Sequence, residues 1–217
     1  MNEAVEVESP MLTPRSQAKA ERRRQLLVAA ARLIAERGFT GVRLEDLGAA
    51  VGISGPAVYR HFPNKDALLV EILVDISRRL FAGGTAVAAS TSDPHDTLEG
   101  LVDFHLDFAL GEQDLIRVQD RELHSLTEDG RRQVRTLQRR YVEIWVGVLC
   151  RIDPALAETD ARTMAHATFG LINSTPHSAD PRSPHSTRTV LRRMALAALD
   201  STHQDPVAPS KAQAEPQ

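Results

Sequence analysis

Apolar residues recur along most of the chain with the period of an α-helix. In the first such stretch, Leu26, Ala30, Leu33 and Ile34 are spaced i, i+4, i+7 and i+8, which places them on one face of a helix. Alternation of Val, Ile, Thr and aromatic residues over the length of a strand is hard to find. The pattern therefore predicts an all-α protein of about nine helices.

Capping residues and breakers divide the periodic stretches into separate predicted helices. Gly38 and Gly52 are placed to end the first two helices, and Asn64 is placed to cap the fourth. The Gly83–Gly84 pair is expected to end the fourth helix. The predicted ranges are 19–37, 44–51, 55–62, 65–82, 96–110, 114–126, 127–152, 160–173 and 187–199.

The two ends of the chain lack helical periodicity. Residues 1–18 and 201–217 are polar and acidic or rich in proline, so we expect a disordered N-terminal arm and a disordered tail.

Composition narrows the class of protein. A chain of 217 residues is long enough to bury a hydrophobic core, and no stretch approaches the roughly 18 consecutive apolar residues of a membrane span. The lone Cys150 cannot form an internal disulfide, and the acidic N-terminus has no apolar signal-peptide core. We expect a cytoplasmic protein with no role in a membrane.

Charge is distributed unevenly along the chain. Residues 14–65 hold ten Lys or Arg against four Asp or Glu, whereas residues 66–217 hold 16 basic against 22 acidic residues. A small basic domain on a larger acidic one is expected where only the first must approach a polyanion.

Two short predicted helices joined by a turn at Gly52 indicate a helix-turn-helix. The run GFTGVRLEDLGAAVGISGPAVYRHFPNKDALL, residues 38–69, resembles the DNA-binding domain of the tetracycline repressor (TetR) family of bacterial transcription regulators. The resemblance implies a helix-turn-helix DNA-binding domain over residues 19–66. It also implies a larger helical ligand-binding and dimerisation domain over residues 67–200.

In this family the third helix reads the major groove, while flanking residues contact phosphates. The small first turn at residues 55–57 then implies close backbone approach to the bases. Tyr59, His61 and Lys65 match phosphate-contacting positions, although each also fits an ordinary packed or solvated role. The expected DNA-binding residues are Arg43, Ser54, Gly55, Pro56, Ala57, Tyr59, Arg60, His61 and Lys65.

Further basic residues precede the motif. Arg22, Arg23 and Arg24 fit a solvated face as well as a phosphate clamp. Two positions depart from the family pattern, because Gly55 replaces a frequent polar base reader and Arg43 replaces a frequent Thr cap. The operator sequence therefore does not follow from the motif.

The resemblance also implies a homodimer that pairs through the last two long helices, residues 159–173 and 187–199, and binds a palindromic DNA operator. The apolar residues of these helices suit such an interface and equally suit an intrachain core. They include Met164, Ala167, Leu171, Val190, Met194 and Leu196.

The middle helices contain candidates for a ligand site. Four aromatic residues cluster there, and Arg131, Arg135 and Arg139 form a stripe that suits either solvent or the phosphates of a nucleotide-bearing ligand. Residues 120–149 are similar to ligand domains of the subgroup associated with fatty-acid and acyl-CoA catabolism, which favours an acyl-CoA thioester as the small-molecule effector. The expected ligand-binding residues are Phe104, Phe108, Arg135, Arg139, Tyr141 and Trp145.

We therefore expect a ligand-responsive transcriptional repressor that an effector releases from DNA. The alternative is a DNA-binding structural or division-linked factor of the same fold without a small-molecule switch. A sizeable cavity in the middle helices would favour the first and a filled core the second. No nucleophile elbow, phosphate loop or metal motif is present, so we expect neither an enzyme nor a cofactor or metal.

Overall fold

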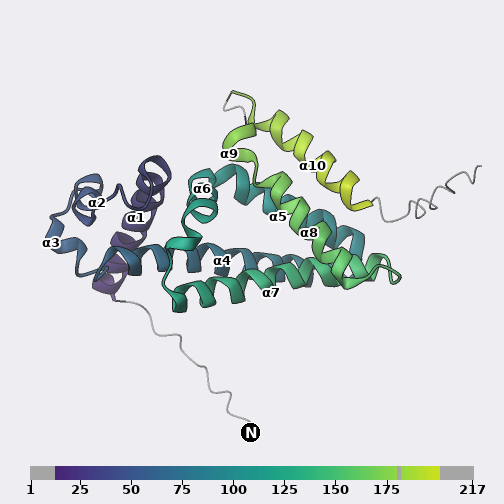
Figure 1. Ribbon diagram of the computed structural model, residues 1–217, viewed down its shortest axis with the longest axis horizontal. Coiled ribbons are helices and arrows are strands. Elements are labelled where there is room, and N and C mark those ends of the chain that lie inside the picture. Colours follow the sequence, from purple (N-terminus) through teal and green to yellow (C-terminus); the bar gives the residue numbers. More distant parts are fainter. Residues whose placement is uncertain (1–12, 180–181, 201–217) are drawn as a thin grey trace, which may run out of the picture. The chain divides into compact units, whose positions relative to one another are not determined.

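The computed structural model describes residues 13–179 and 182–200, which form ten α-helices and one 3₁₀-helix with no strand among them (Figure 1). The all-α prediction is confirmed. The elements are α1 (Pro14–Arg37), α2 (Leu44–Val51), α3 (Gly55–Val58), α4 (Lys65–Ser90), α5 (Pro94–Gly111), α6 (Gln113–Glu122), η1 (Leu123–Ser125), α7 (Glu128–Ile152), α8 (Glu158–Ile172), α9 (Thr175–Ser178) and α10 (Pro184–Asp200).

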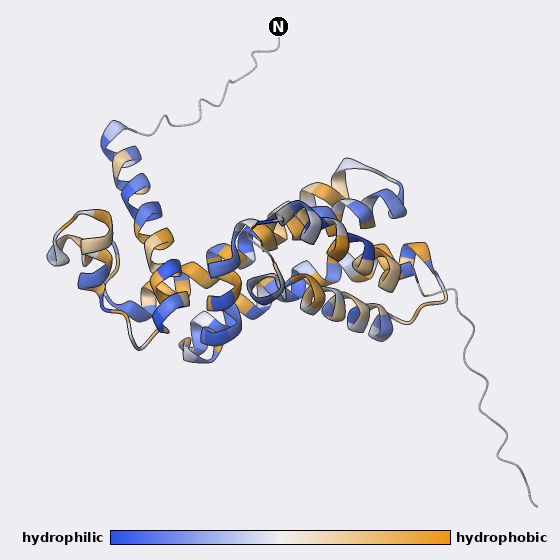
Figure 2. Cartoon of the chain, turned by 90° about the horizontal axis from the view of Figure 1, so that it is seen from above, coloured by the Kyte–Doolittle hydropathy of each residue, from blue (hydrophilic) through white to orange (hydrophobic). Residues whose placement is uncertain are grey.

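Helix α1 begins within the stretch that was expected to be disordered. The Thr13 hydroxyl accepts the backbone N–H of Ser16 at 3.3 Å, and Pro14 occupies the first turn, where its missing N–H costs nothing. The expectation of disorder is therefore wrong for residues 14–18, while residues 1–12 and 201–217 lie outside the described residues. The first half of α1 is largely hydrophilic (Figure 2).

The predicted break at Gly83–Gly84 is wrong, because α4 continues without interruption to Ser90. Both glycines instead allow aromatic rings to approach the helix. A Cβ atom at Gly83 would clash with the Phe104 ring, and one at Gly84 would lie 2.6 Å from Cε2 of Tyr141. Here glycine permits close packing and does not end the helix.

The chain divides into two compact units. Unit 1 comprises residues up to Arg79 together with 112–138, and unit 2 comprises residues 80–111 together with the chain from Arg139 onward. The domain boundary expected at residue 66 therefore falls inside unit 1, which also takes in α6 and the start of α7. No described helix is long and apolar enough to cross a membrane.

In unit 1, α1 packs against α2 and α6, and α2 packs against α3. The core of this unit is built from apolar side chains that are almost fully inaccessible to solvent. They include Leu26, Ile34, Leu47, Val58, Phe62, Leu69 and Leu73.

In unit 2, α10 packs against α5 and α8. Arg192 on α10 pairs with Asp103 and Glu99 of α5 at 3.0 and 2.7 Å, and Arg188 pairs with Asp103 at 2.9 Å. These ion pairs flank an apolar contact that includes the buried Leu191.

Substitution of Gly84 by Ala tests the close-packing role. Because the added methyl group must displace the buried Tyr141 ring, we expect the free energy of unfolding to fall by about 1–3 kcal/mol in urea denaturation. Gly147 on α7 is the matched control, since no atom lies within 4 Å of its Cβ position. Gly147→Ala should stabilise the protein by up to about 1 kcal/mol. Equal effects of the two substitutions would contradict this role.

Candidate nucleic-acid interface

The turn between α2 and α3 is fixed by two glycines. Gly52 adopts the left-handed conformation with φ 71° and ψ 34°, which favours glycine. A Cβ atom at Gly48 would lie 2.8 Å from the carbonyl oxygen of Ile53 and 3.2 Å from Cγ2 of Val58. The Gly48 carbonyl accepts the N–H of Ile53 at 2.9 Å. The glycines thus bring α2 and α3 into direct contact.

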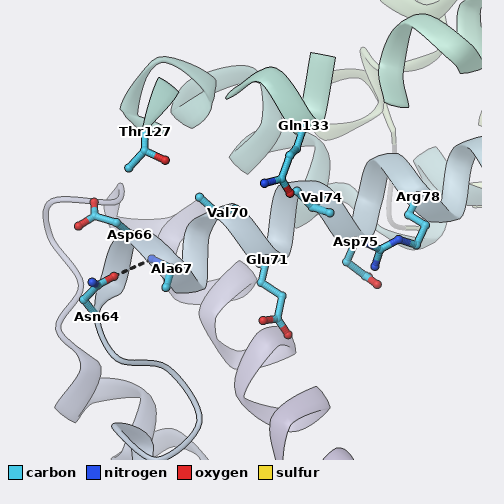
Figure 3. A pocket seen from close by; sticks show the side chains of 10 residues that line it. All are labelled: Asn64, Asp66, Ala67, Val70, Glu71, Val74, Asp75, Arg78, Thr127 and Gln133. Carbon is cyan, nitrogen blue, oxygen red and sulfur yellow. Dashed lines mark hydrogen bonds between the residues drawn. The ribbon is translucent and has the colours of Figure 1, made fainter. Parts of the chain in front are cut away.

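Helix α3 is shorter than predicted, because it ends at Val58 and residues 59–61 form a hydrogen-bonded turn. Val58 and Phe62 are both fully buried, as the i, i+4 spacing predicts. Ser54 precedes α3 but its side chain makes no capping hydrogen bond. Asn64 does cap α4, because its Oδ1 accepts the N–H of Ala67 at 2.7 Å (Figure 3).

The first turn of α3 faces solvent. Ser54 and Pro56 are exposed, and Gly55 and Ala57 are half-buried. Tyr59 is 49% exposed, and its hydroxyl donates to Oε1 of Glu45 on α2 at 3.2 Å. The charge of Glu45 raises the pKa of Tyr59, so the hydroxyl remains a hydrogen-bond donor.

The basic residues of this unit fall into two groups. Arg43 and Arg60 are exposed, and their guanidinium groups make no hydrogen bond or ion pair within the described residues. Arg22, Arg23 and Arg24 have internal partners. Arg22 donates to the Val51 carbonyl at 3.1 Å, whereas Arg23 binds the His61 carbonyl and the Glu71 carboxylate, and Arg24 pairs with Glu21 at 2.7 Å.

Lys65 is also engaged internally. Its Nζ donates to the carbonyl oxygens of Phe39 and Val42 at 2.7 and 3.0 Å and lies 4.4 Å from the centre of the Phe39 ring. Two of the three ammonium protons therefore stabilise the α1–α2 connection, which leaves one proton for a further acceptor. The solvated-lysine interpretation does not describe this side chain.

Helix α6 contacts the same connection, through residues that sequence reasoning did not select. The buried Glu122 carboxylate accepts the N–H of Phe39 at 3.0 Å and the Ser125 hydroxyl at 3.2 Å. Arg121 donates to the carbonyl of Ala35 at 3.1 Å. Because these partners lie more than 80 residues apart in the chain, no local motif could reveal them.

His61 lies close to several positively charged side chains of unit 1. Burial lowers the pKa of His61, and the charges of Arg23, Lys19, Arg22 and Arg60 lower it further, so the ring is neutral near pH 7. Its Nδ1 is buried and has no hydrogen-bond partner within residues 13–179 and 182–200. The ring therefore has unused hydrogen-bonding capacity beside positive charge.

Two of the predicted ligand-binding aromatic residues form part of the core of unit 2. Tyr141 and Trp145 are 4% and 0% exposed, and both pack around Phe169 and the buried His105. The two ring nitrogens of His105 bond to the Tyr141 hydroxyl at 3.0 Å and to Oδ1 of Asn173 at 3.1 Å. Burial lowers the pKa of His105 to about 4 and raises that of Tyr141.

The other predicted ligand-binding residues are more accessible. Phe104 and Phe108 are half-buried on α5. Arg135 and Arg139 are exposed on α7, and neither makes a hydrogen bond or ion pair with another described residue. By contrast, Arg131 donates to the carbonyls of His124 and Leu126, so this member of the arginine stripe is structural.

A groove of about 630 Å³ lies between α4 and the start of α7 (Figure 3). Val70 and Val74 contribute apolar surface, while Glu71 and Asp75 are already paired with Arg23 and Arg79. No group of three His, Cys, Asp or Glu side chains that could hold a metal ion occurs in the part of the chain that the structure describes.

The structure thus presents a helix-turn-helix unit in which the first turn of α3 is accessible to solvent, together with a second helical unit. Sequence comparison matches residues 26–72 to "Bacterial regulatory proteins, tetR family" and residues 91–202 to "Tetracyclin repressor-like, C-terminal domain". The chain belongs to the TetR family, as its resemblance indicated.

Among its relatives is the HTH-type transcriptional repressor KstR2 of Rhodococcus jostii, 32% identical over 132 residues, which are 60% of this chain and 65% of that protein. The match thus spans just under two thirds of that relative. The fold is similar to that of the TetR family transcriptional regulator PfmR from Thermus thermophilus, with a TM-score of 0.71, 23% identity and coverage of 83% of this chain and 100% of the other. It is also similar to AibR in complex with isovaleryl coenzyme A and operator DNA, with a TM-score of 0.69, 19% identity and coverage of 80% and 97%.

The low pKa of His105 predicts sensitivity to acid. Protonation is favoured in the unfolded chain below about pH 6.5 but in the folded chain only below about pH 4. The free energy of unfolding should therefore fall by about 3 kcal/mol as the pH is lowered through this window. Urea denaturation across this range should show a smaller loss in His105→Phe, which cannot titrate. An unchanged pH profile in that variant would contradict the assignment.

Proposed function

We propose that this protein is a DNA-binding transcriptional regulator, and specifically a repressor that binds a palindromic operator as a homodimer. The observation that carries the proposal is the exposed first turn of α3, which packs against α2 and precedes the His61 carbonyl bound by Arg23. In the same unit, Arg43 and Arg60 have no hydrogen-bond or ion-pair partner for their guanidinium groups among the described residues. In this proposal residues 54–57 meet base edges in the major groove, and Arg43 and Arg60 bind phosphates.

The remaining predicted contacts take supporting roles. The exposed Tyr59 hydroxyl exchanges its bond to Glu45 for a phosphate oxygen, and the neutral His61 ring offers a further hydrogen bond. Lys65 contributes its remaining proton while it continues to hold the α1–α2 connection. The relative KstR2, an HTH-type transcriptional repressor, and the structurally similar AibR, in complex with operator DNA, support this assignment.

Removal of an unpaired arginine tests the DNA contact. Arg60→Gln should weaken binding to DNA from the region upstream of the protein's own gene about tenfold. It should also reduce the steepness of the plot of log binding constant against log salt concentration by about one per protein chain, because each chain loses one phosphate contact. Fluorescence anisotropy over a salt series measures both quantities. Arg37→Gln is the matched control, since this exposed α1 arginine also makes no ion pair but lies outside the reading turn. Equal losses in the two variants would reject the docking.

The homodimer is supported by surface that one chain leaves uncovered. Val190 and Met194 of α10 are 42% and 47% exposed. Ala167 of α8 is also exposed, and Met164, Leu171 and Leu196 are only partly buried. The intrachain core instead uses other residues of these helices, among them Ala165, Ile172, Leu191 and Ala195. The six residues predicted for the interface are therefore accessible to a second copy.

A charge at the centre of this surface should separate the dimer. Met194→Glu should raise the dimer dissociation constant at least about tenfold in sedimentation experiments, because an unpaired carboxylate would be buried between the chains. Met194→Leu keeps the apolar surface and should remain dimeric. A Met194→Glu protein that sediments like the unsubstituted protein would exclude this interface.

For the effector we propose an acyl-CoA thioester whose phosphates bind Arg135 and Arg139. These arginines are exposed and unpaired, unlike Arg131 and Arg132, which pair with Glu128 and Asp129. The isovaleryl coenzyme A in the AibR complex supports this class of ligand. Helix α4 contains residues of both units. In this proposal, a shift of α4 on ligand binding changes the position of the helix-turn-helix and thereby the affinity for DNA.

The double variant Arg135→Ala, Arg139→Ala should lose most of the response of the protein–DNA complex to an acyl-CoA panel, while its affinity for DNA without ligand stays the same. Arg132→Ala is the control on the same helix, because its guanidinium group already pairs with Asp129. Titration of the DNA complex with acetyl-CoA, isovaleryl-CoA and octanoyl-CoA measures the response. Retention of the full response in the double variant would remove these arginines from the site.

The packed aromatic core favours a second candidate function. Tyr141, Trp145 and His105 fill the interior of unit 2 around Phe169, which suits a structural or division-linked DNA-binding factor without a small-molecule switch. Specific DNA binding that ignores every thioester in the titration would support this alternative.

A further inference from the structure

A groove of about 580 Å³ runs along α1 within unit 1 and meets α4 and the start of α6. Val28 on its wall is 60% exposed, so its side chain offers apolar surface at the edge of the groove. A second hollow of about 330 Å³ adjoins Val28, toward Ala50 of α2. The apolar lining of the larger groove comprises Leu27, Val28, Ala31, Ile72, Ile76 and Leu115.

Most charges around this groove are neutralised within the protein. Arg79 pairs with Asp75 and Glu112 at 3.2 and 3.1 Å. Asp114 pairs with Arg117 at 3.1 Å. Arg23 and Arg24 pair with Glu71 and Glu21, as described above.

Arg32 differs from these residues. It lines both hollows, is exposed, and makes no hydrogen bond or ion pair with any other described residue. It follows Val28 by four residues, so the two side chains share one face of α1. Among the described residues, the groove therefore combines an apolar floor with one arginine at its edge that has no paired carboxylate.

We propose that this groove binds an amphipathic monoanion, namely an extended apolar chain that ends in a carboxylate. The chain covers Val28 and Leu27, and the carboxylate accepts hydrogen bonds from the Arg32 guanidinium group. The groove volume falls in the range of about 300–1,000 Å³ typical of small-molecule sites. Its α1 lining, from Ala20 to Arg32, extends about 18 Å at 1.5 Å per residue, enough for a chain of about ten carbons.

This site goes beyond the proposed function, because it lies in the DNA-binding unit and uses none of the acyl-CoA residues on α7. A molecule bound in the groove would also affect the position of α3. Arg23 lines the groove and at the same time binds the His61 carbonyl after α3 and the Glu71 carboxylate on α4. The apolar end of the occupant lies toward Arg23, and a displacement of this side chain would disturb its bonds to both acceptors, so we expect the bound chain to weaken DNA binding.

Calorimetric titration of the full-length protein with sodium decanoate, without DNA, tests the site. We expect saturable binding of one decanoate per chain, and weaker binding of the uncharged decanol. Arg32→Gln should weaken decanoate binding about tenfold, because a charge-assisted hydrogen bond is lost. Val28→Glu should abolish decanoate binding, because it places a second negative charge beside the apolar lining of the groove. Arg37→Gln, which removes an unpaired α1 cation outside the groove, should bind normally.

The proposal would be overturned if decanoate showed no saturable binding, or if its binding survived both Arg32→Gln and Val28→Glu. It would also be overturned if the main change in the Val28→Glu protein were a lower sedimenting mass, because the groove would then be an interface between copies of the chain. Because position 28 is exposed, both variants should retain the thermal unfolding of the unsubstituted protein. The titration contains no DNA, so failure of the proposed regulator function leaves its outcome intact, and the reverse also holds.

Discussion

The arrangement of the helix-turn-helix unit depends on how the connection between α1 and α2 is held. Helix α3 has only four residues, too few to be stable alone, so its position is set by its neighbours. The Phe39 backbone is bonded on both sides, with its N–H to Glu122 of α6 and its carbonyl to Lys65 of α4. These bonds fix the start of α2, and Gly48 then fixes α3 against α2. A shift of α6 or α4 that broke these bonds would therefore release the connection that positions α2 and α3.

The sequence was sufficient to predict those features that depend on neighbouring residues. Helical periodicity gave the class of fold and most helices, and the Asn64 cap and the left-handed Gly52 were confirmed by their geometry. Gly83 and Gly84 were misinterpreted because glycine both ends helices and permits close packing, and the sequence does not show which ring approaches it. The Phe104 and Tyr141 rings that decide the matter come from distant parts of the chain.

Long-range contacts also decided which charged residues remain available. By composition the arginines of the basic segment are equivalent. Arg23, however, is bound to Glu71 and the His61 carbonyl, whereas Arg43 and Arg60 have no such partner in the part of the chain that the structure describes. A paired arginine contributes less to a new anion, because its existing partner must first be displaced. Net charge therefore indicated a basic segment correctly but overestimated the number of cations that it presents. The lack of an internal partner among the described residues likewise distinguishes Arg32 from the other arginines of the α1 groove.

The packed interior of unit 2 constrains how any effector could act there. His105 is held between Tyr141 and Asn173, and its low pKa keeps it neutral, so a ligand entering this core must replace two hydrogen bonds or leave buried polar groups unpaired. A ligand bound at exposed arginines of α7 or in the α1 groove avoids this cost. In either case the ligand changes DNA binding only if it binds the DNA-free arrangement more tightly than the DNA-bound one. The α1 groove is lined by residues of α4 and α6, the helices that hold the α1–α2 connection, so the affinity of a ligand there depends on how these helices are arranged.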